Sequence, residues 1–211
     1  MRTYDVKKER ADLYAPKPGD FQIVDVPEMA FLMLDGHGDP NTTVAYREAV
    51  EALYVASYAV RALAKQTLGT VHTVAPLEGL WSAEDLAVFR TRDKSAWDWT
   101  MMIAQPEWIP AGMVEDALAA ARAKRQLPAL RSVRFQRYTE GPSVQVLHIG
   151  SYDDEGPALE RLHDQFLPAH GLAPGGRHHE IYLSDPRRTE PAKLRTILRQ
   201  PVTAAARPSG G

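Results

Sequence analysis

The sequence predicts an α+β protein built from two related halves, each with the element order strand, helix, strand, strand. Short apolar strands alternate along the chain with segments whose apolar residues recur at helical spacing. A weak internal repeat supports the division, because FLMLDG at residues 31–36 resembles QVLHIG at residues 145–150. In each half, a loop and a helix then lead to a strand that carries an acid and an aromatic residue. These pairs are Glu78 with Trp81, and Glu180 with Tyr182.

The third strands of the two halves also end alike, in Gln105-Pro106 and in Gln200-Pro201. We predict one domain over residues 1–202, with half one at about 21–106, a connecting helix at about 110–126 and half two at about 132–202. Residues 203–211 are predicted to be a disordered tail. The first helix is longer than the second, so the repeat is not in strict register, and chance similarity is the alternative explanation.

The first half begins after a predicted arm of residues 1–20, which ends in the turn-rich PKPGD. Partial alternation from Phe21 to Leu34 predicts two short strands, or one strand broken at Pro27. A helix is predicted from about Val44 to Lys65, and either Thr42 or Thr43 can cap it. The remaining predicted elements of this half are a strand within residues 70–82, a strand over residues 97–105 and the connecting helix.

The second half begins with predicted strands over residues 132–139 and 143–149, joined by a hairpin-like turn at Glu140-Gly141-Pro142. A helix is predicted from about Pro157 to His170, because Gly171 is a natural stop. Beyond it, alternation predicts a strand over residues 177–184 and a final edge strand over residues 196–202.

Composition excludes several classes of function. The 211 residues are 44% hydrophobic and 25% charged, as in an ordinary folded protein. A net charge of −2 gives no electrostatic reason to expect nucleic acid as a partner. The chain has no cysteine, which excludes disulfides, thiolate metal sites and cysteine nucleophiles together.

The N-terminal segment is charged and has no apolar core, so it is not a signal peptide. No apolar run approaches the roughly 20 residues that a membrane helix needs. The sequence therefore predicts a cytoplasmic protein that makes no membrane contact, and it leaves the oligomeric state open.

The strand at residues 177–184 (RHHEIYLS) carries the sharpest functional signal. Alternation places His179, Ile181 and Leu183 on one face, suited to packing under a helix. The other face carries His178, Glu180, Tyr182 and Ser184. If this face lines a cleft, Glu180 is a candidate general base and Tyr182 its hydrogen-bonding partner, with His178 beside them. A solvent-exposed polar face is the alternative.

Aromatic residues form a second group of candidate ligand contacts. Trp97 and Trp99 fall on one face of their predicted strand, and with Trp81 they are candidate flat walls for an aromatic ligand. Tryptophan is more often core, which is the alternative. Tyr54 and Tyr58 stand four apart on the first helix and so share a face, either toward the core or toward the ligand.

No metal or cofactor site is predicted. His178 and His179 are adjacent on a strand and point to opposite faces, so they do not readily share an ion. The glycines lack the flanking pattern of a phosphate loop, and Ser184 lacks the context of a serine hydrolase nucleophile.

The chain resembles the GyrI-like (DNA-gyrase-inhibitor-like) small-molecule-binding family over nearly its whole length. The segment that carries the resemblance most specifically is HHEIYLSDPRRTEPAKLRTILRQPV at residues 178–202. Further support comes from DVKKERADLYAP, FLMLDGHGDPN, AVEALYVASYAV, LEGLW and WDWTMMIAQP.

The resemblance implies a duplicated β-α-β-β fold, of the SHS2 type, with pseudo-twofold symmetry and a ligand cleft between the halves. One subgroup of stand-alone members is similar to hydrolases that open the cyclopropane of DNA-alkylating cyclopropanoid compounds, which is a detoxification. In that subgroup a glutamate and aromatic residues of the cleft are functional, and the matching positions here are Glu180 and Tyr182, with Trp81, Trp97 and Trp99 as candidate walls.

The sequence thus predicts that a small, flat, apolar or aromatic molecule is bound and turned over without a cofactor. Two other functions remain open at this stage. The protein could bind, sequester or sense a drug without turning it over, or it could bind and inhibit DNA gyrase. A cleft glutamate suits a general base and a receptor for cationic drugs equally well.

Overall fold

The computed structural model describes residues 3–84 and 93–205 of the chain. The strands are β1 (Gln22–His37), β2 (Leu77–Ser82), β3 (Asp98–Gln105), β4 (Arg134–Ile149), β5 (Leu172–Pro174), β6 (His178–Tyr182) and β7 (Arg195–Ala204). The α-helices are α1 (Val6–Glu9), α2 (Ala11–Tyr14), α3 (Val44–Leu68), α5 (Ala111–Lys124), α6 (Gly156–Glu160) and α7 (Leu167–Ala169). Short 3₁₀ segments are η1 (Lys94–Ala96), η2 (Pro128–Arg131), η3 (Tyr152–Asp154) and η5 (Pro191–Lys193), and η4 (Arg161–Phe166) is a π-helical segment.

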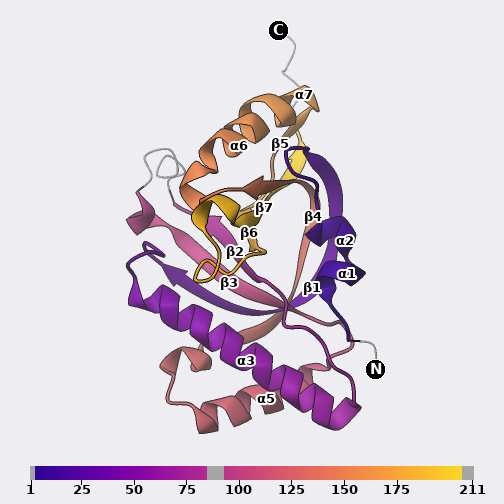
Figure 1. Cartoon of the computed structure of the whole chain (residues 1–211), viewed down its shortest axis with the longest axis vertical. Helices are drawn as coiled ribbons and strands as arrows, with labels where there is room; N and C mark the ends of the chain where they lie inside the picture. The colour runs from indigo at the N-terminus through magenta and orange to yellow at the C-terminus, as the bar shows by residue number, and fades with distance from the viewer. Residues whose placement is uncertain (1–2, 85–92, 206–211) are drawn as a thin grey trace.

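Six of the strands close into an antiparallel barrel, so the fold is α+β as predicted (Figure 1). Around the barrel the order is β1-β3-β2-β6-β7-β4, and β4 pairs with β1 to close it. In this order β1, β3 and β2, from residues 22–105, are neighbours on one side of the barrel, and β6, β7 and β4, from residues 134–204, are neighbours on the other. Because the barrel is closed, each of these six strands pairs with a neighbouring strand on both sides.

The two long strands, β1 and β4, each continue without a break through a point at which the sequence predicts an interruption. β1 continues across Pro27, and its pairing with β4 resumes on both sides of the proline at Val26 and Glu28. β4 continues through the predicted turn at residues 140–142, so the hairpin prediction is wrong. Gly141 has φ of +75°, which glycine adopts without steric cost. β4 continues through Gly141 without reversing, and Gly141 pairs with Val26 of β1.

The last strand is not an edge strand as predicted. β7 pairs along its length with β4 and β6, and its end also pairs with the short β5, which the sequence analysis missed. Residues 203 and 204 belong to β7, so the predicted tail begins in a paired strand. Residues 206–211 of that predicted tail lie outside the described residues.

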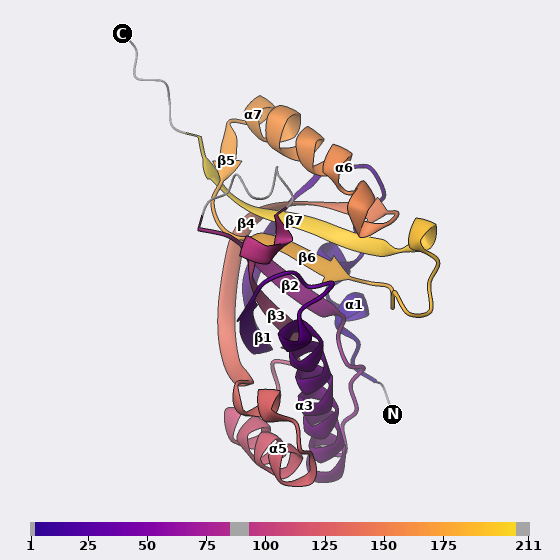
Figure 2. The ribbon, with the colours of Figure 1, turned by 90° about the vertical axis from the view of Figure 1, so that its left-hand side faces the viewer.

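Helices cover the outside of the barrel at opposite ends (Figure 2). α3 begins after Thr43, one of the two predicted caps, although the Thr43 side chain makes no capping hydrogen bond. It packs on β1 and β3 and against α5. At the far end, α6, η4 and α7 form one helical run over residues 156–169, close to the predicted helix. Every helix of residues 3–84 and 93–205 is too short or too polar to cross a bilayer.

The predicted N-terminal arm is part of the folded body. α1 and α2 lie within it, and the side chains of Leu13 and Tyr14 at the end of α2 are buried. Leu13 belongs to the main hydrophobic core, and Tyr14 hydrogen-bonds to a residue of β2. The segment looked like an arm because its apolar residues are few, but those few are the ones that reach the interior.

A close contact between Gly36 of β1 and Trp99 of β3 yields a stability prediction. The two residues are paired across the strands, and a Cβ atom added at Gly36 would lie 2.0 Å from the Trp99 ring. Since Trp99 is only 2% exposed, its ring has no room to move away. We expect Gly36→Ala to lower the free energy of unfolding by about 1–3 kcal/mol, measured by chemical denaturation.

Gly112 of α5 is the matched control, because a Cβ added there meets no atom within 4 Å. Gly112 lies in the first turn of α5, so Gly112→Ala should leave the free energy of unfolding unchanged or raise it by up to about 0.5 kcal/mol, since alanine favours a helix over glycine. Equal effects of the two substitutions would contradict the contact with Trp99.

Candidate functional site

The alternation predicted for β6 is present, and it separates two polar groups onto opposite faces of the barrel wall. β6 pairs with β2 so that Glu180 lies opposite Gly79, Tyr182 opposite Leu77 and His178 opposite Trp81. This face is the outer one, and Tyr46 of α3 reaches it by stacking on Trp81. The other face of β6, with His179 and Ile181, points into the barrel. The expectation that His179 packs under a helix is therefore wrong.

A hydrogen-bond chain links Trp81, Tyr182 and Glu180 on the outer face. The Tyr182 hydroxyl donates to Glu180 Oε2 at 2.7 Å and accepts from the Trp81 indole Nε1 at 3.1 Å. Burial and the neighbouring Glu180 carboxylate raise the pKa of Tyr182 far above its usual value. Tyr182 therefore stays protonated, and its single proton is committed to Glu180. The Glu180 side chain is 16% exposed.

Aromatic rings surround this chain. The Tyr46 ring of α3 stacks on Trp81 at 6.4 Å between centroids, and Trp97 meets Trp81 edge-on at 5.5 Å. From the other side, Tyr152 of η3 meets the Tyr182 ring edge-on at 5.6 Å. Tyr46 and Tyr152 were not among the predicted residues, because only the folded chain brings residues 46 and 152 to β6.

The other predicted aromatic residues lie at different depths. Trp99 contacts Tyr46 edge-on at 5.3 Å, but it is buried over Gly36 and belongs to the core. Tyr54 is half-buried, and burial followed by the nearby Asp185 raises its pKa. Tyr58, one turn farther along α3, is 56% exposed. The structure thus brings Trp81, Trp97 and His178 next to Glu180 and Tyr182, and it sets Tyr58 apart in solvent.

Several buried polar atoms near Glu180 make no hydrogen bond within the described residues. They are Oε1 of Glu155, Oγ1 of Thr196 and both ring nitrogens of His178. His178 Nε2 lies 3.4 Å from Glu180 Oε1 without forming a hydrogen bond. Thr196 of β7 pairs with Tyr182 of β6, so it shares the outer face. Since proteins rarely leave buried polar groups unpaired, such a cluster is typical of a ligand-binding site.

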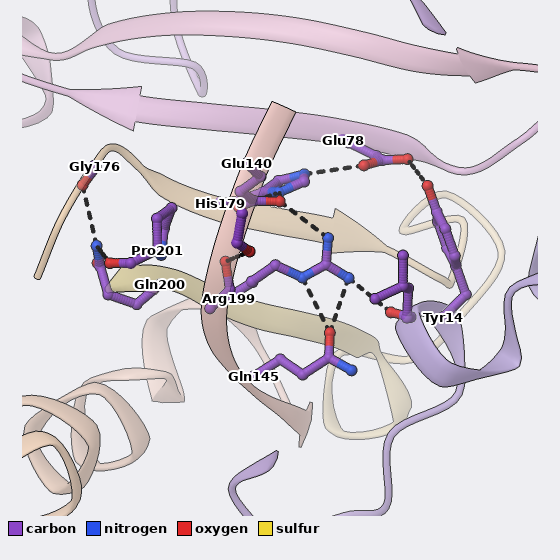
Figure 3. Close-up of polar contacts among 12 residues, drawn as sticks. Tyr14, Glu78, Glu140, Gln145, Gly176, His179, Arg199, Gln200 and Pro201 are labelled. Carbon is purple, nitrogen blue, oxygen red and sulfur yellow. Dashed lines mark hydrogen bonds and ion pairs between the residues drawn. The ribbon is translucent and has the colours of Figure 1, made fainter. Parts of the chain in front are cut away.

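On the opposite face of β6, polar side chains around His179 form a connected network in the barrel interior (Figure 3). His179 Nε2 lies 2.9 Å from Glu78 Oε2, and His179 Nδ1 lies 3.0 Å from both Glu140 oxygens. Arg199 NH1 donates to Glu140 at 3.2 Å. Gln145 accepts two hydrogen bonds from Arg199, and Tyr14 donates to Glu78 at 2.7 Å.

The network contains two carboxyl groups, Glu78 and Glu140, and two basic side chains, His179 and Arg199. The His179 side chain is 1% exposed, yet the two adjacent carboxylates outweigh burial and raise the pKa of His179 to about 8. For Glu140, His179 and Arg199 outweigh burial and lower its pKa to about 2. Sequence analysis placed Glu78 and Glu180 in equivalent positions. In the structure they lie on opposite faces of the barrel wall, because Glu78 pairs with Ile181 rather than with Glu180.

The larger of two described cavities, of about 350 Å³, lies away from Glu180, and it is lined by Asp35, Gly36, Asp98, Trp99, Thr100, Arg134 and Arg177. Its polar groups are largely satisfied by one another. Arg134 pairs with Asp35 at 2.8 Å, and Arg177 donates to Thr100 at 2.7 Å. The polar groups of this cavity have partners, whereas the outer face of β6 carries buried atoms without one. We take the outer face as the site, since unsatisfied groups require a partner and satisfied groups do not.

Within residues 3–84 and 93–205, no group of three or more His, Asp or Glu side chains is arranged to hold a metal ion.

Comparison with known proteins gives a family and close structural neighbours. The sequence profile of the GyrI-like small molecule binding domain matches residues 19–202. No curated protein is a significant sequence relative of the chain. Among solved structures, an uncharacterized conserved protein from Listeria innocua is 38% identical, with a TM-score of 0.87 over 95% of this chain and 100% of that one.

Two further Listeria innocua structures are named as hydrolases. One is 35% identical, with a TM-score of 0.83 over 95% of this chain and all of its own. The other, encoded by lin2189, is 36% identical, with a TM-score of 0.84 over 96% of this chain and all of its own.

The interior network predicts how stability depends on pH. The folded-state pKa of His179, about 8, lies above its usual 6.5, so its stabilising effect is complete below pH 6.5 and is lost as pH rises through 8. We expect the difference in unfolding free energy between wild type and His179→Gln to shrink by about 1.5 kcal/mol between pH 6.5 and 8.5, measured by urea denaturation.

Glu140 predicts the opposite dependence in acid. Its pKa of about 2 lies below the usual 4.5, so its stabilising effect is complete above pH 4.5 and is lost as pH falls toward 2.

For His179, one result would contradict a charged side chain in the folded protein: a difference in unfolding free energy between wild type and His179→Gln that stays constant from pH 6.5 to 8.5.

Proposed function

The chain belongs to the GyrI-like family of small-molecule binding proteins, and from this premise we propose that it is a hydrolase in which Glu180 activates water against a small, flat electrophile. The observation that carries the proposal is Glu180 itself, a largely buried carboxylate oriented by the hydroxyl of Tyr182 at 2.7 Å. The names of two Listeria innocua structures, both about a third identical to this chain, support the reaction class.

The proposed ligand cleft lies on the outer face of β2 and β6. These two strands occupy corresponding positions in the two halves and pair with each other, so the proposed pseudo-twofold axis passes between them. Gly79, directly opposite Glu180, has no side chain, and the Trp81 indole lies over it: a Cβ at Gly79 would stand 2.9 Å from Nε1. A flat ligand would meet Trp81, Trp97 and Tyr46 as its walls.

The proposed substrate is a cyclopropanoid compound, in which a cyclopropane is fused at a spiro carbon to a conjugated dienone. Water adds through its oxygen to the cyclopropane methylene while Glu180 takes a proton from it. The bond from the methylene to the spiro carbon breaks, and its electron pair moves through the ring to the distant carbonyl oxygen. The ring becomes a phenol. Water is consumed and only protons are moved, so the proposed reaction calls on no cofactor.

We expect Glu180→Gln to lower turnover of a spirocyclopropyl dienone by about 10²–10⁴-fold, because an amide does not accept the proton from water. Binding should change less, since the amide fills the same space. The measurement is product formation followed by mass spectrometry over multiple turnovers.

Glu78→Gln is the matched control on the inner face. It removes a charge from the interior network, so it should lower the unfolding free energy, while the folded fraction retains most of its turnover. Turnover in Glu180→Gln close to that of wild type would sink the base assignment.

A second function, binding of a lipophilic cation without turnover, is favoured by the same carboxylate among aromatic rings. It predicts that a planar aromatic cation quenches tryptophan fluorescence, and that Glu180→Gln weakens its binding at least tenfold. A neutral analogue of the same shape is the control and should bind both proteins equally. Equal binding of cation and neutral analogue to wild type would rule this function out.

A further inference from the structure

The proposed reaction needs a proton donor as well as a base. Negative charge develops on the substrate oxygen as the cyclopropane opens, and a donor placed there stabilises the transition state. Tyr182 is the donor that the sequence suggested. Its proton is already held by Glu180 Oε2, and its oxygen already accepts from Trp81. Another group must therefore serve the substrate oxygen.

Glu155 is placed to be that group. It directly follows η3, whose Tyr152 lies against the Tyr182 ring, so the segment 152–155 covers the outer face of β6. Glu155 is 5% exposed, and its Oε1 has no hydrogen-bond partner within the described residues. A buried carboxyl oxygen without a partner is costly unless the group is neutral or a ligand pairs with it.

The charges around Glu155 come from three elements. Burial is the largest influence, followed by the Glu180 carboxylate of β6, and both raise the pKa of Glu155; the Thr196 hydroxyl of β7 interacts with the carboxyl group and lowers it, and the result is a pKa of about 10. Lys94 of η1 lowers it and Asp153 of η3 raises it, and these two lie 3.7 Å apart as an ion pair. The tyrosines of the site, Tyr152 and Tyr182, also have raised pKa values and stay neutral. Glu155 thus holds a proton at neutral pH.

We propose that Glu155 is the acid partner of Glu180, donating its proton to the substrate oxygen on which negative charge develops. The inference deepens the proposed hydrolase function and rests on it. A buried carboxyl group that keeps its proton close to a second carboxyl group is a common basis for pairing an acid with a base. In one turnover Glu180 gains a proton from water, Glu155 loses one to the phenol oxygen, and exchange with solvent restores both.

The test compares Glu155→Gln with wild type on a spirocyclopropyl dienone between pH 6 and 10.5. An amide has no acidic proton to give, so kcat at pH 7 should fall about 10²-fold, with KM little changed. In wild type, kcat should decline as pH rises toward 10, because Glu155 then loses its proton. This decline should be absent in the variant. Thermal melting should be unchanged or raised at pH 7, since a destabilising buried acid has been removed.

A substituent on the dienone ring makes the test specific to the oxygen end of the substrate. Electron-withdrawing groups make the departing phenol oxygen less basic, so it needs a donor less. The loss caused by Glu155→Gln should shrink along such a series, whereas the loss caused by Glu180→Gln should stay constant. A merely structural role for Glu155 would move neither the pH profile nor this dependence.

The outcomes separate the two proposals. If wild type does not turn the dienone over, the hydrolase proposal fails and the acid assignment fails with it. If wild type turns over and Glu180→Gln does not, but Glu155→Gln keeps kcat within threefold and retains the alkaline decline, only the acid assignment fails. His178→Gln is the control for the other unpaired group. If the decline of kcat toward pH 10 is absent in His178→Gln but present in Glu155→Gln, His178 is the acid and the assignment of Glu155 fails.

Discussion

The charged network inside the barrel is the interaction on which the rest of this structure depends. Four ionisable side chains and a tyrosine are removed from water there, and each finds its partners among the others, on strands β2, β4, β6 and β7 and on helix α2. Removing any one member would strand a buried charge, which typically costs about 3–5 kcal/mol. The network therefore fixes the register of the strands on either side of β6, and it ties down an N-terminal segment that has little apolar surface of its own.

Because side chains alternate along a strand, this interior network also positions the outer face. His179 and Glu180 are consecutive residues, so the two carboxylates and the arginine that hold His179 also fix the backbone from which Glu180 projects. Tyr182 then orients the Glu180 carboxylate from the same strand. A base must stand within hydrogen-bond reach of its proton, so the rigidity of β6 bears directly on any chemistry proposed for Glu180.

Local patterns in the sequence predicted the elements well and their long-range partners poorly. Helical spacing located α3, α5 and the 156–169 run, and alternation separated Glu180 from His179. Pro27 and Gly141 misled the prediction, because both residue types are common in turns, whereas here each lies within a strand whose pairing continues on both sides of it. Closure of the barrel, the entry of Tyr14 and the placement of Glu155 beside Glu180 depend on contacts between distant parts of the chain. No local pattern encodes those contacts, and an acid at residue 155 looks like a solvated loop residue until the fold buries it.

The two faces of β6 differ in a way that is itself informative. Inside the barrel every carboxylate has a partner, whereas on the outer face Glu155, Thr196 and His178 retain buried polar atoms without one. The fold provides hydrogen-bond partners for Glu78 and Glu140. It provides none for these atoms of the outer face. Folding stability alone gives no reason to keep two carboxyl groups close together in a dry environment, because holding one of them neutral there costs free energy. Proteins retain such costs where binding or chemistry needs a group poised in its less favourable state. The interior network stabilises the fold. That stability offsets the cost of keeping Glu155 buried and protonated near Glu180, the proposed base.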